Sequence, residues 1–379
     1  MESTPISETA AGKVAAPRML SLDALRGFDM FWIIGGGAFL EAVAARWPSP
    51  WMQALQAQFT EHVEWDGFRF HDGIFPLFLF IIGATLPWSI GRRVENGTPR
   101  ASIVGKVLVR FLWLVVFGLV INGLTRLEGW SELRLFGVLQ RQAFGYLAVA
   151  LLYLFAPRRW WPWLWAGILL AYGAMLAFVP VPGHGVGLYT PEGNLANHVD
   201  RVVLLPGQMY KEYGDPEGPL SNLPSIATAL MGLMAGDYLH RGGGSPSRKS
   251  MVLAAAGIAC FAAGCALHPV VPVIKKIWTS SFVLVSGGVS LVLLAAFHEV
   301  LDVRKWTRGS AVWAAIGANA ITAYMGVHIV DFDGISEKFV VGLMRLYPAE
   351  KDLLLRGGAL LIVLLALHGM RRKGIFLRV

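Results

Sequence analysis

Residues 73–91 read GIFPLFLFIIGATLPWSIG, a continuous apolar run without a charged side chain. A helix that spans a bilayer needs about 20 mostly apolar residues, so this run has the length of one membrane crossing. Pro76 and Pro87 lie within it. Each proline removes a helical hydrogen bond, which predicts a bent helix that can open a cavity.

The rest of the chain repeats this pattern. Apolar runs of similar length occur near residues 28–45, 73–91, 103–124, 135–156, 160–180, 222–240, 251–273, 278–298, 310–330 and 353–370. Hydrophobic residues make up 55% of the chain and charged residues only 15%, against roughly 25% charged residues in soluble domains. The sequence therefore predicts an all-α polytopic membrane protein with about ten transmembrane helices.

The positions of the basic residues predict the orientation. Cytoplasmic loops of membrane proteins hold an excess of Lys and Arg, and with the N-terminus inside more than half of the 33 basic residues fall on inner segments. This predicts that both termini are cytoplasmic. The net charge of +8 is thereby explained as a topology signal, and we expect no nucleic acid partner.

The chain divides into two unequal parts. Residues 1–17 are small and polar, which predicts a disordered cytoplasmic tail. Residues 18–379 form one predicted transmembrane domain with a Gly/Pro-rich outer loop at 181–221, and loops of this length tend to be functional or disordered. We interpret the first apolar run as a signal anchor. The two cysteines, Cys260 and Cys265, lie in one apolar run and indicate neither a disulfide framework nor a metal site.

A few polar side chains fall inside the apolar runs, where ionisable groups are costly and are therefore functional candidates. Gln140 and Arg141 precede Gln142 in successive helical positions. Since such positions are about 100° apart, we expect some of the three to face the bundle interior. Asn319 and His328 are nine residues apart, on opposite faces of a continuous helix. They either line a cavity or form hydrogen bonds with a neighbouring helix.

His62 and Asp72 flank the outer end of the 73–91 run. Histidine suits proton transfer near neutral pH, and a carboxylate can fix its tautomer and stabilise its cation. The pair fits a general base or a nucleophile in acyl transfer. The spacing alone equally fits a structural pair at the membrane surface.

Four segments in a fixed order carry a family resemblance. They are SLDALRG at 21–27, HVEWDGFRFHDGIFPLFLFIIG at 62–83, GVLQRQAFGY at 137–146 and DPEGPLSNLPSIATALMGLMAG at 215–236. Together they resemble the catalytic domain of the heparan-alpha-glucosaminide N-acetyltransferase family and its bacterial relatives, within the transmembrane acyltransferases. The resemblance covers nearly the whole chain after residue 18.

The resemblance implies roles for named residues. The family's catalytic histidine, followed by Trp and Asp or Asn, matches His62, Trp65 and Asp66, and its catalytic aspartate matches Asp72. We expect Trp65, Asp66, Gln140, Arg141, Asn319 and His328 to bind substrate or line its cavity. The family also uses an asparagine near the end of its first span, where this chain has IIGGGAF at 33–39, so no residue is carried over for that group.

The resemblance further implies the substrates and the location. The family transfers an acetyl group from cytosolic acetyl-CoA to an amino sugar across the membrane, without a metal. CoA phosphates need cationic partners, for which the candidates are Arg26, Arg18, Arg92 and Arg93; positive-inside topology explains these arginines equally well. The implied partners are acyl-CoA, an amino-sugar or glycan acceptor and the lipid bilayer, and a homodimer is allowed. The implied location is a bacterial inner (plasma) membrane.

Two other functions also fit a polytopic helical chain. A sugar transporter or permease would bind its substrate in the polar interior without bond chemistry, although no internal repeat is evident. A membrane scaffold without activity would tolerate replacement of His62 and Asp72. Dependence on acyl-CoA distinguishes the enzyme from both.

Overall fold

The structure is a computed structural model that describes residues 19–126 and 129–376. The predicted tail at residues 1–17 and the candidate Arg18 lie outside the described residues. Within the described part of the chain the protein is all-helical, with only isolated β-bridges and no strand. This confirms the all-α part of the predicted fold class.

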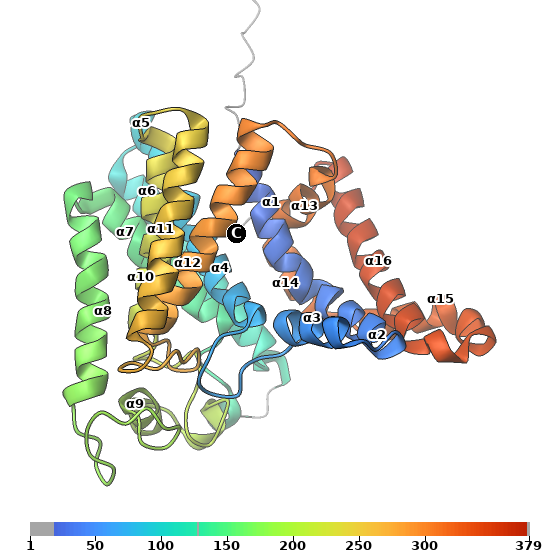
Figure 1. The fold of residues 1–379 in the computed structure, drawn as a ribbon, viewed down its shortest axis with the longest axis horizontal. Helices are drawn as coiled ribbons and strands as arrows, with labels where there is room; N and C mark the ends of the chain where they lie inside the picture. The colour runs from blue at the N-terminus through green and yellow to red at the C-terminus, as the bar shows by residue number, and fades with distance from the viewer. Residues whose placement is uncertain (1–18, 127–128, 377–379) are drawn as a thin grey trace, which may run out of the picture.

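Long helices form the body of the molecule (Figure 1). They are α1 (Leu20–Phe31), α4 (Ile74–Ala84), α6 (Arg100–Ile121), α7 (Val138–Phe155), α8 (Trp161–Phe178), α10 (Asn222–Arg241), α11 (Pro246–Leu267), α12 (Ser280–Phe297), α13 (Ser310–Ala318), α14 (Ala320–Ile329) and α16 (Lys351–Arg372). Other helices lie at the bundle ends: α2 (Gly37–Arg46), α3 (Pro50–Thr60), α5 (Arg92–Glu95), α9 (Leu195–Val203) and α15 (Phe332–Leu346).

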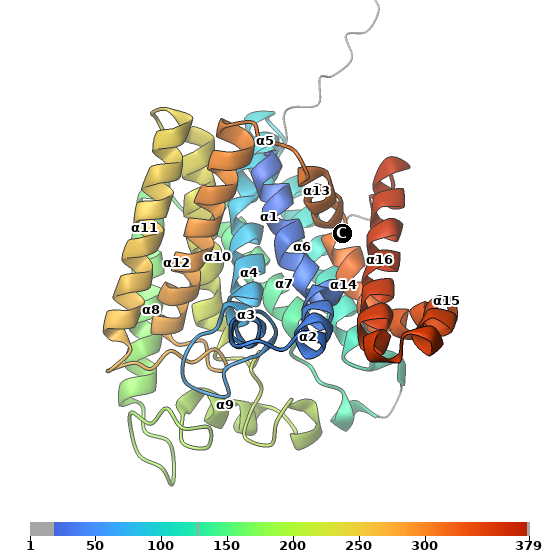
Figure 2. The ribbon, with the colours of Figure 1, turned by 45° about the vertical axis from the view of Figure 1, so that its right-hand side comes forward.

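The chain runs up and down through the bundle. The start of α1 and the end of α16 lie at the same end, near α5, whereas α9 and its flanking chain lie at the opposite end (Figures 1 and 2). Both views agree on this alternation. Beyond α16 the chain turns back toward the break between α13 and α14, where Ile375 O accepts a hydrogen bond from Asn319 Nδ2.

Eight helices in the described residues are long and apolar enough to cross a membrane, or nine if the bent pair α13 and α14 counts as one span. All ten predicted runs are helical. The remaining predicted span is α10, which has 20 residues but contains polar positions such as Asn222, Ser225 and Thr228. Because these side chains are buried against other helices, α10 does not need the apolar surface of a lipid-facing span.

The core of the bundle is the contact between α4 and α10, which is close because glycines remove side chains from it. A Cβ on Gly83 would lie 1.9 Å from the carbonyl oxygen of Ala229, and one on Gly232 would lie 1.9 Å from that of Phe80. Small residues at such positions let helix backbones approach closely in membranes. The span Phe70–Glu95, which contains the 73–91 run, is thus the most buried of the eight candidate spans. Inside the protein, 78% of its most apolar window is buried.

Several spans are irregular. The three-glycine segment of the first span forms a π-helical turn at Trp32–Gly36 with Gly35 at φ 130°, and a second π-helical turn begins at Pro87. Pro76 lies instead in the first turn of α4, where its missing N–H costs no hydrogen bond, so the bend expected there is wrong. The predicted span 310–330 is bent by 73° at Asn319, which overturns the opposite-face geometry of a continuous helix.

The segments outside the membrane spans are also ordered. Residues 181–221 contain α9 and the 3-10 turn Pro206–Gln208, with α9 capped by the Asn194 side chain, which accepts a hydrogen bond from the Asn197 N–H. Figures 1 and 2 show this segment covering one end of the bundle. The segment 181–221 is therefore an ordered part of the domain.

Candidate active site

The site is built on the chain that enters α4. His62 Nδ1 lies 2.8 Å from Asp72 Oδ1, and the Asp72 side chain is 2% exposed whereas that of His62 is 53% exposed. Asp72 belongs to a 3-10 turn, Phe70–Gly73, that leads directly into α4. The aspartate is thus fixed in the protein, and the imidazole stands at the open edge.

Asp72 is bonded as an ionised carboxylate. Its Oδ2 accepts the backbone N–H groups of Val63 at 3.3 Å and Arg69 at 3.1 Å, while Oδ1 faces His62. A carboxylate only accepts hydrogen bonds, so the proton of a neutral His62 must sit on Nδ1. This leaves Nε2 with the lone pair that a general base or nucleophile needs.

A lysine completes the cluster. Lys275 Nζ lies 3.4 Å from Asp72 Oδ1 and 3.1 Å from His62 Nδ1. Burial lowers the pKa of Lys275 from its usual value, and the carboxylates of Asp72 and Glu217 oppose this shift. No pattern in the sequence points to Lys275, because it lies about 200 residues after Asp72 along the chain, in a link between two spans.

His71 is the other imidazole in the cluster. Its ring centroid lies 4.4 Å from that of His62. His71 and His62 line one cavity of about 240 Å³, together with Lys275, Glu217, Gln142, Tyr324, His328 and apolar residues that include Ile74, Phe78 and Ile321. We call this the histidine cavity.

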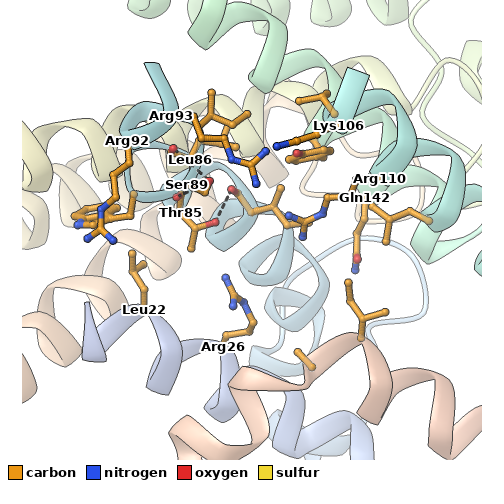
Figure 3. Close-up of a pocket in the computed structure, with 18 of the residues that line it drawn as sticks. Leu22, Arg26, Thr85, Leu86, Ser89, Arg92, Arg93, Lys106, Arg110 and Gln142 are labelled. Carbon is orange, nitrogen blue, oxygen red and sulfur yellow. Dashed lines mark hydrogen bonds between the residues drawn. The ribbon is translucent and has the colours of Figure 1, made fainter. Parts of the chain in front are cut away.

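A second, larger cavity of about 850 Å³ lies toward the end of the bundle that carries α5. Its lining includes Arg26 from α1, Arg92 and Arg93 from α5, and Lys106 and Arg110 from α6, with Asp23 as an acidic neighbour. Figure 3 shows Arg26, Arg93, Lys106 and Arg110 directed toward a common space. We call this the cationic cavity, and five basic groups around one space favour an anionic ligand.

The two cavities meet inside the bundle. Phe78, Gln142 and Ile321 line both of them. These three side chains therefore stand between the two cavities, and a ligand anchored in the cationic cavity would reach His62 only by passing them. The three residues come from α4, α7 and α14.

The three successive polar residues of α7 have different surroundings. Gln142 lines both cavities, whereas Gln140 packs against Gly118 of α6. The Arg141 guanidinium donates to Pro216 O at 2.8 Å and to Ser221 Oγ, and lies 4.5 Å from the Trp278 ring centroid. Gln140 and Arg141 line neither of these two cavities, whereas Gln142 lines both, so the expected role of Gln140 and Arg141 in binding substrate or lining its cavity stays a prediction. The helical rotation of about 100° per residue explains the difference.

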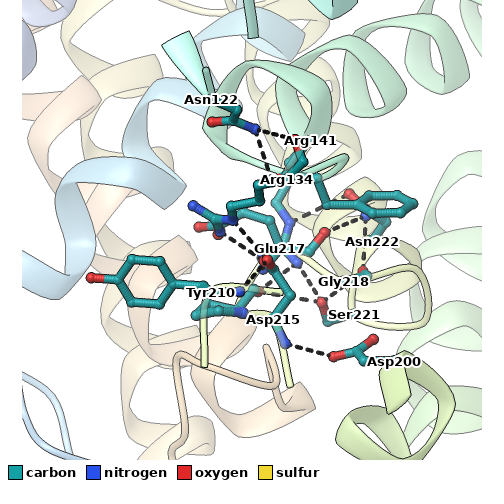
Figure 4. Close-up of polar contacts among 12 residues, drawn as sticks. Asn122, Arg134, Arg141, Asp200, Tyr210, Asp215, Glu217, Gly218, Ser221 and Asn222 are labelled. Carbon is teal, nitrogen blue, oxygen red and sulfur yellow. Dashed lines mark hydrogen bonds and ion pairs between the residues drawn. The ribbon is translucent and has the colours of Figure 1, made fainter. Parts of the chain in front are cut away.

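Arg141 is part of a network that shapes the DPEG segment (Figure 4). The Arg134 guanidinium donates two hydrogen bonds of 2.7 Å to Asp215 and pairs with Glu217, which raises the Arg134 pKa although its burial acts in the opposite direction. Asp215 Oδ1 accepts the Glu217 N–H at 2.9 Å. The network thus holds Glu217 at the histidine cavity.

Trp65 and Asp66 connect the loop that carries His62 to two other loops. The Trp65 indole donates to Tyr189 O at 2.7 Å, and Asp66 Oδ1 lies 3.6 Å from His268 Nδ1. Neither is among the residues that line the two cavities. In this structure they fix the loop that carries His62, and direct contact with a cavity-bound substrate is not part of their geometry.

Asn319 and His328 have different surroundings. Asn319 is the break between α13 and α14, and its Nδ2 donates to Ile375 O at 3.3 Å near the chain end. Asn319 lines neither of these two cavities, and its predicted role in binding substrate or lining its cavity stays a prediction. His328 lines the histidine cavity, with Nδ1 2.8 Å from Tyr324 O.

The sequence candidates for phosphate contacts lie in one place. Arg26, Arg92 and Arg93 all line the cationic cavity, and Lys106 and Arg110 join them. Lys106 and Arg110 are four residues apart on α6, a spacing that places two side chains on one helix face. That spacing was the signal in the sequence that would have found them.

No group of three or more metal-ligating side chains occurs in the part of the chain that the structure describes. The expectation that no metal takes part stays a prediction.

Comparison with known proteins gives a consistent family. The family model described as "Heparan-alpha-glucosaminide N-acetyltransferase, catalytic" matches residues 18–258. The Homo sapiens protein named heparan-alpha-glucosaminide N-acetyltransferase is 25% identical over 375 residues, which cover 83% of this chain and 53% of the human protein. The Mus musculus protein of the same name is 24% identical over 377 residues, with 84% and 54% covered. The chain spans about half the length of these curated relatives.

Proposed function

The chain belongs to the heparan-alpha-glucosaminide N-acetyltransferase family, and from that premise we propose that it is a transmembrane acyltransferase. It moves an acetyl group from cytosolic acetyl-CoA to the amine of a glucosamine-type sugar on the far side of the membrane. The observation that carries the proposal is the junction of the cationic cavity with the histidine cavity at Phe78, Gln142 and Ile321. A donor and an acceptor on opposite sides of a bilayer need such a connection.

The cationic cavity is the proposed donor site and marks the cytoplasmic side. CoA carries several phosphates, and phosphates bind strongly to arginine clusters. The start of α1 and the end of α16 lie at this same end of the bundle. This agrees with cytoplasmic termini, ten crossings and one transmembrane domain over residues 18–379, which we propose for a bacterial inner membrane. A homodimer stays a prediction.

The histidine cavity is the proposed reaction site. In direct transfer, Nε2 of His62 takes a proton from the acceptor amine, whose nitrogen attacks the thioester carbon. The C–N bond forms, the C–S bond breaks, and the thiolate of CoA takes the proton from His62. In the alternative route, His62 Nε2 first accepts the acetyl group itself and CoA leaves as the thiolate. The amine then attacks the acetyl-imidazole, Nε2 of His62 is the leaving group, and the proton of the amine passes to the CoA thiolate.

Asp72 has the same role in both routes. Its hydrogen bond holds the Nδ1 proton and thereby directs the lone pair on Nε2 toward the substrate. Two backbone N–H groups hold the carboxylate in turn. The preorganised pair does not have to rearrange when the substrates bind.

The test uses the purified protein in detergent with radiolabelled acetyl-CoA and glucosamine. We expect acetylated glucosamine from the native chain and none from His62→Ala at the same thermal stability. If neither protein transfers label, acetyl-CoA binding by calorimetry separates a wrong acceptor from a wrong reaction.

Transport is the competing function, because the same joined cavities also form a path between the two sides. Uptake of unmodified labelled glucosamine into proteoliposomes, independent of acetyl-CoA, would establish transport and remove the acyltransferase proposal.

A further inference from the structure

We propose that Lys275 is the third member of the His62–Asp72 centre, a positioning residue that balances the charge of Asp72 so that His62 can release its proton within each turnover. This assignment rests on the proposed function above. Lys275 lies outside the region matched by the family, residues 18–258.

The loop that carries Lys275 is held rigidly against the loop that carries His62. Val273 O accepts the Gly67 N–H at 2.9 Å, which joins the two loops. Thr279 Oγ1 accepts the Ile274 N–H at 3.0 Å and donates to Pro272 O at 2.8 Å. Ile274, Ile277 and Trp278 are buried under the loop. These contacts fix the backbone on both sides of Lys275.

The contacts of the ammonium are decided by which atoms can accept. Because Nδ1 of His62 carries a proton that it donates to Asp72 Oδ1, the 3.1 Å separation between Nζ and Nδ1 joins two donors. Lys275 therefore donates to Asp72 Oδ1, at 3.4 Å. One carboxylate oxygen thus accepts from both the imidazole and the ammonium.

This arrangement affects the proton that His62 handles. When Nε2 accepts a proton from the amine, the imidazolium has both the Asp72 carboxylate and the Lys275 ammonium close to its Nδ1. Without Lys275 the buried carboxylate would stabilise the imidazolium unopposed and slow the return of its proton to the CoA thiolate. The Lys275 ammonium opposes this stabilisation of the His62 imidazolium, because a like charge within about 4–6 Å disfavours the charged form.

The other groups at the cavity leave this balance to Lys275. The His71 ring lies beside that of His62, tilted by 41°, and His328 and Tyr324 line the cavity from α14. Glu217 lines the cavity as a carboxylate, but Arg134 pairs with it. Lys275 is therefore the cation in direct contact with the His62–Asp72 pair.

The experiment compares Lys275→Met and Lys275→Arg with Lys276→Met as the matched control. Lys276 is the next residue, but its Nζ lies over the Trp65 ring, 5.6 Å from the centroid. We expect Lys275→Met to move the acid limb of the kcat/KM profile toward higher pH by about one unit and to lower kcat. Lys275→Arg keeps the charge and should keep the limb in place, and Lys276→Met should match the native protein.

A second readout does not depend on transfer. With histidine labelled at ring 13Cε1, the His62 resonance is identified by its loss in His62→Ala, and its pH titration is followed by NMR in the full chain. We expect its midpoint to rise in Lys275→Met. Lys275→Gln serves in the same measurement if the methionine variant does not fold.

The outcomes separate the two proposals. A folded Lys275 variant with unchanged titration and unchanged acid limb overturns the assignment of Lys275, even if activity falls, because the loss would then be structural. Native protein without transfer but with the expected shift of the His62 titration sinks the proposed function and supports the charge balance.

Discussion

The imidazole of His62 contacts the carboxylate of Asp72 through Nδ1, at 2.8 Å, while two backbone N–H groups hold the other carboxylate oxygen. The direction of these hydrogen bonds decides which nitrogen of His62 is basic. In Asp72→Asn the amide oxygen will face the two N–H groups, and the amide NH2 will then face Nδ1. The proton of His62 moves to Nε2, which can no longer act as a base.

We therefore expect Asp72→Asn to lower kcat for acetyl transfer by about 100-fold or more, since general base catalysis contributes 10²–10⁴-fold. Steady-state transfer assays measure this, with thermal unfolding as the check on folding. Activity close to the native level in a folded Asp72→Asn protein would remove the proposed role of the pair.

The junction between the two cavities gives a second prediction. Ile321→Trp places an indole where the cationic and histidine cavities meet. Binding of acetyl-CoA phosphates should be largely retained, but the thioester should no longer reach His62. We expect kcat to fall by at least about 100-fold, because misplacement of about 1 Å already has an effect of that size. Ile321→Val is the control, and equal loss of binding and transfer would contradict the path.

The cationic cavity can be tested against an arginine on the same helix. Arg110 lines the cavity, whereas Arg100 lies against the Phe155 ring, outside the lining. Arg110→Gln should raise the Kd for acetyl-CoA by roughly 10-fold, the effect of one hydrogen bond to a charged group. Arg100→Gln should leave it unchanged. Calorimetric titration measures both, and equal effects would assign the arginines to topology alone.

The contact between α4 and α10 predicts a stability effect. Gly83→Ala puts a methyl group 1.9 Å from Ala229 O, a backbone atom that cannot move aside. Overpacking of this kind costs about 1–3 kcal/mol, so the midpoint of thermal unfolding should fall. Gly167→Ala in α8 meets no atom within 4 Å and should leave the midpoint unchanged or higher. A similar response of both variants would contradict this packing.

Asp200 gives a prediction about pH. Burial, together with the neighbouring Asp215 carboxylate, raises the pKa of Asp200 from 3.8 to about 7. Between these values the folded protein binds a proton that the unfolded chain has released, so the free energy of unfolding falls as the pH rises from about 4 to about 7. Asp200→Asn keeps an oxygen for the Asp215 N–H, which Asp200 Oδ2 accepts at 3.0 Å.

Thermal unfolding over this pH range should therefore be flatter for Asp200→Asn than for the native protein. The variant should gain most relative to the native chain above pH 7. Parallel curves for the two proteins would show that Asp200 is not the titrating group.

The sequence by itself determined the membrane-spanning helical class. Runs of about 20 apolar residues fold as helices because the bilayer offers no hydrogen-bond partners to the backbone. The same local signals marked His62, Asp72 and the arginines of α5, because ordered motifs and charge positions are properties of the chain.

Only the tertiary structure decided which polar groups meet. Lys275 reaches Asp72 because the link between α11 and α12 docks on the chain before α4, and no local pattern encodes that contact. Helix rotation selected Gln142 over Gln140 and Arg141, and the bend at Asn319 placed Ile321 at the cavity junction. Each of these depends on packing between segments distant in the chain, whereas the apolar runs depend only on their own composition.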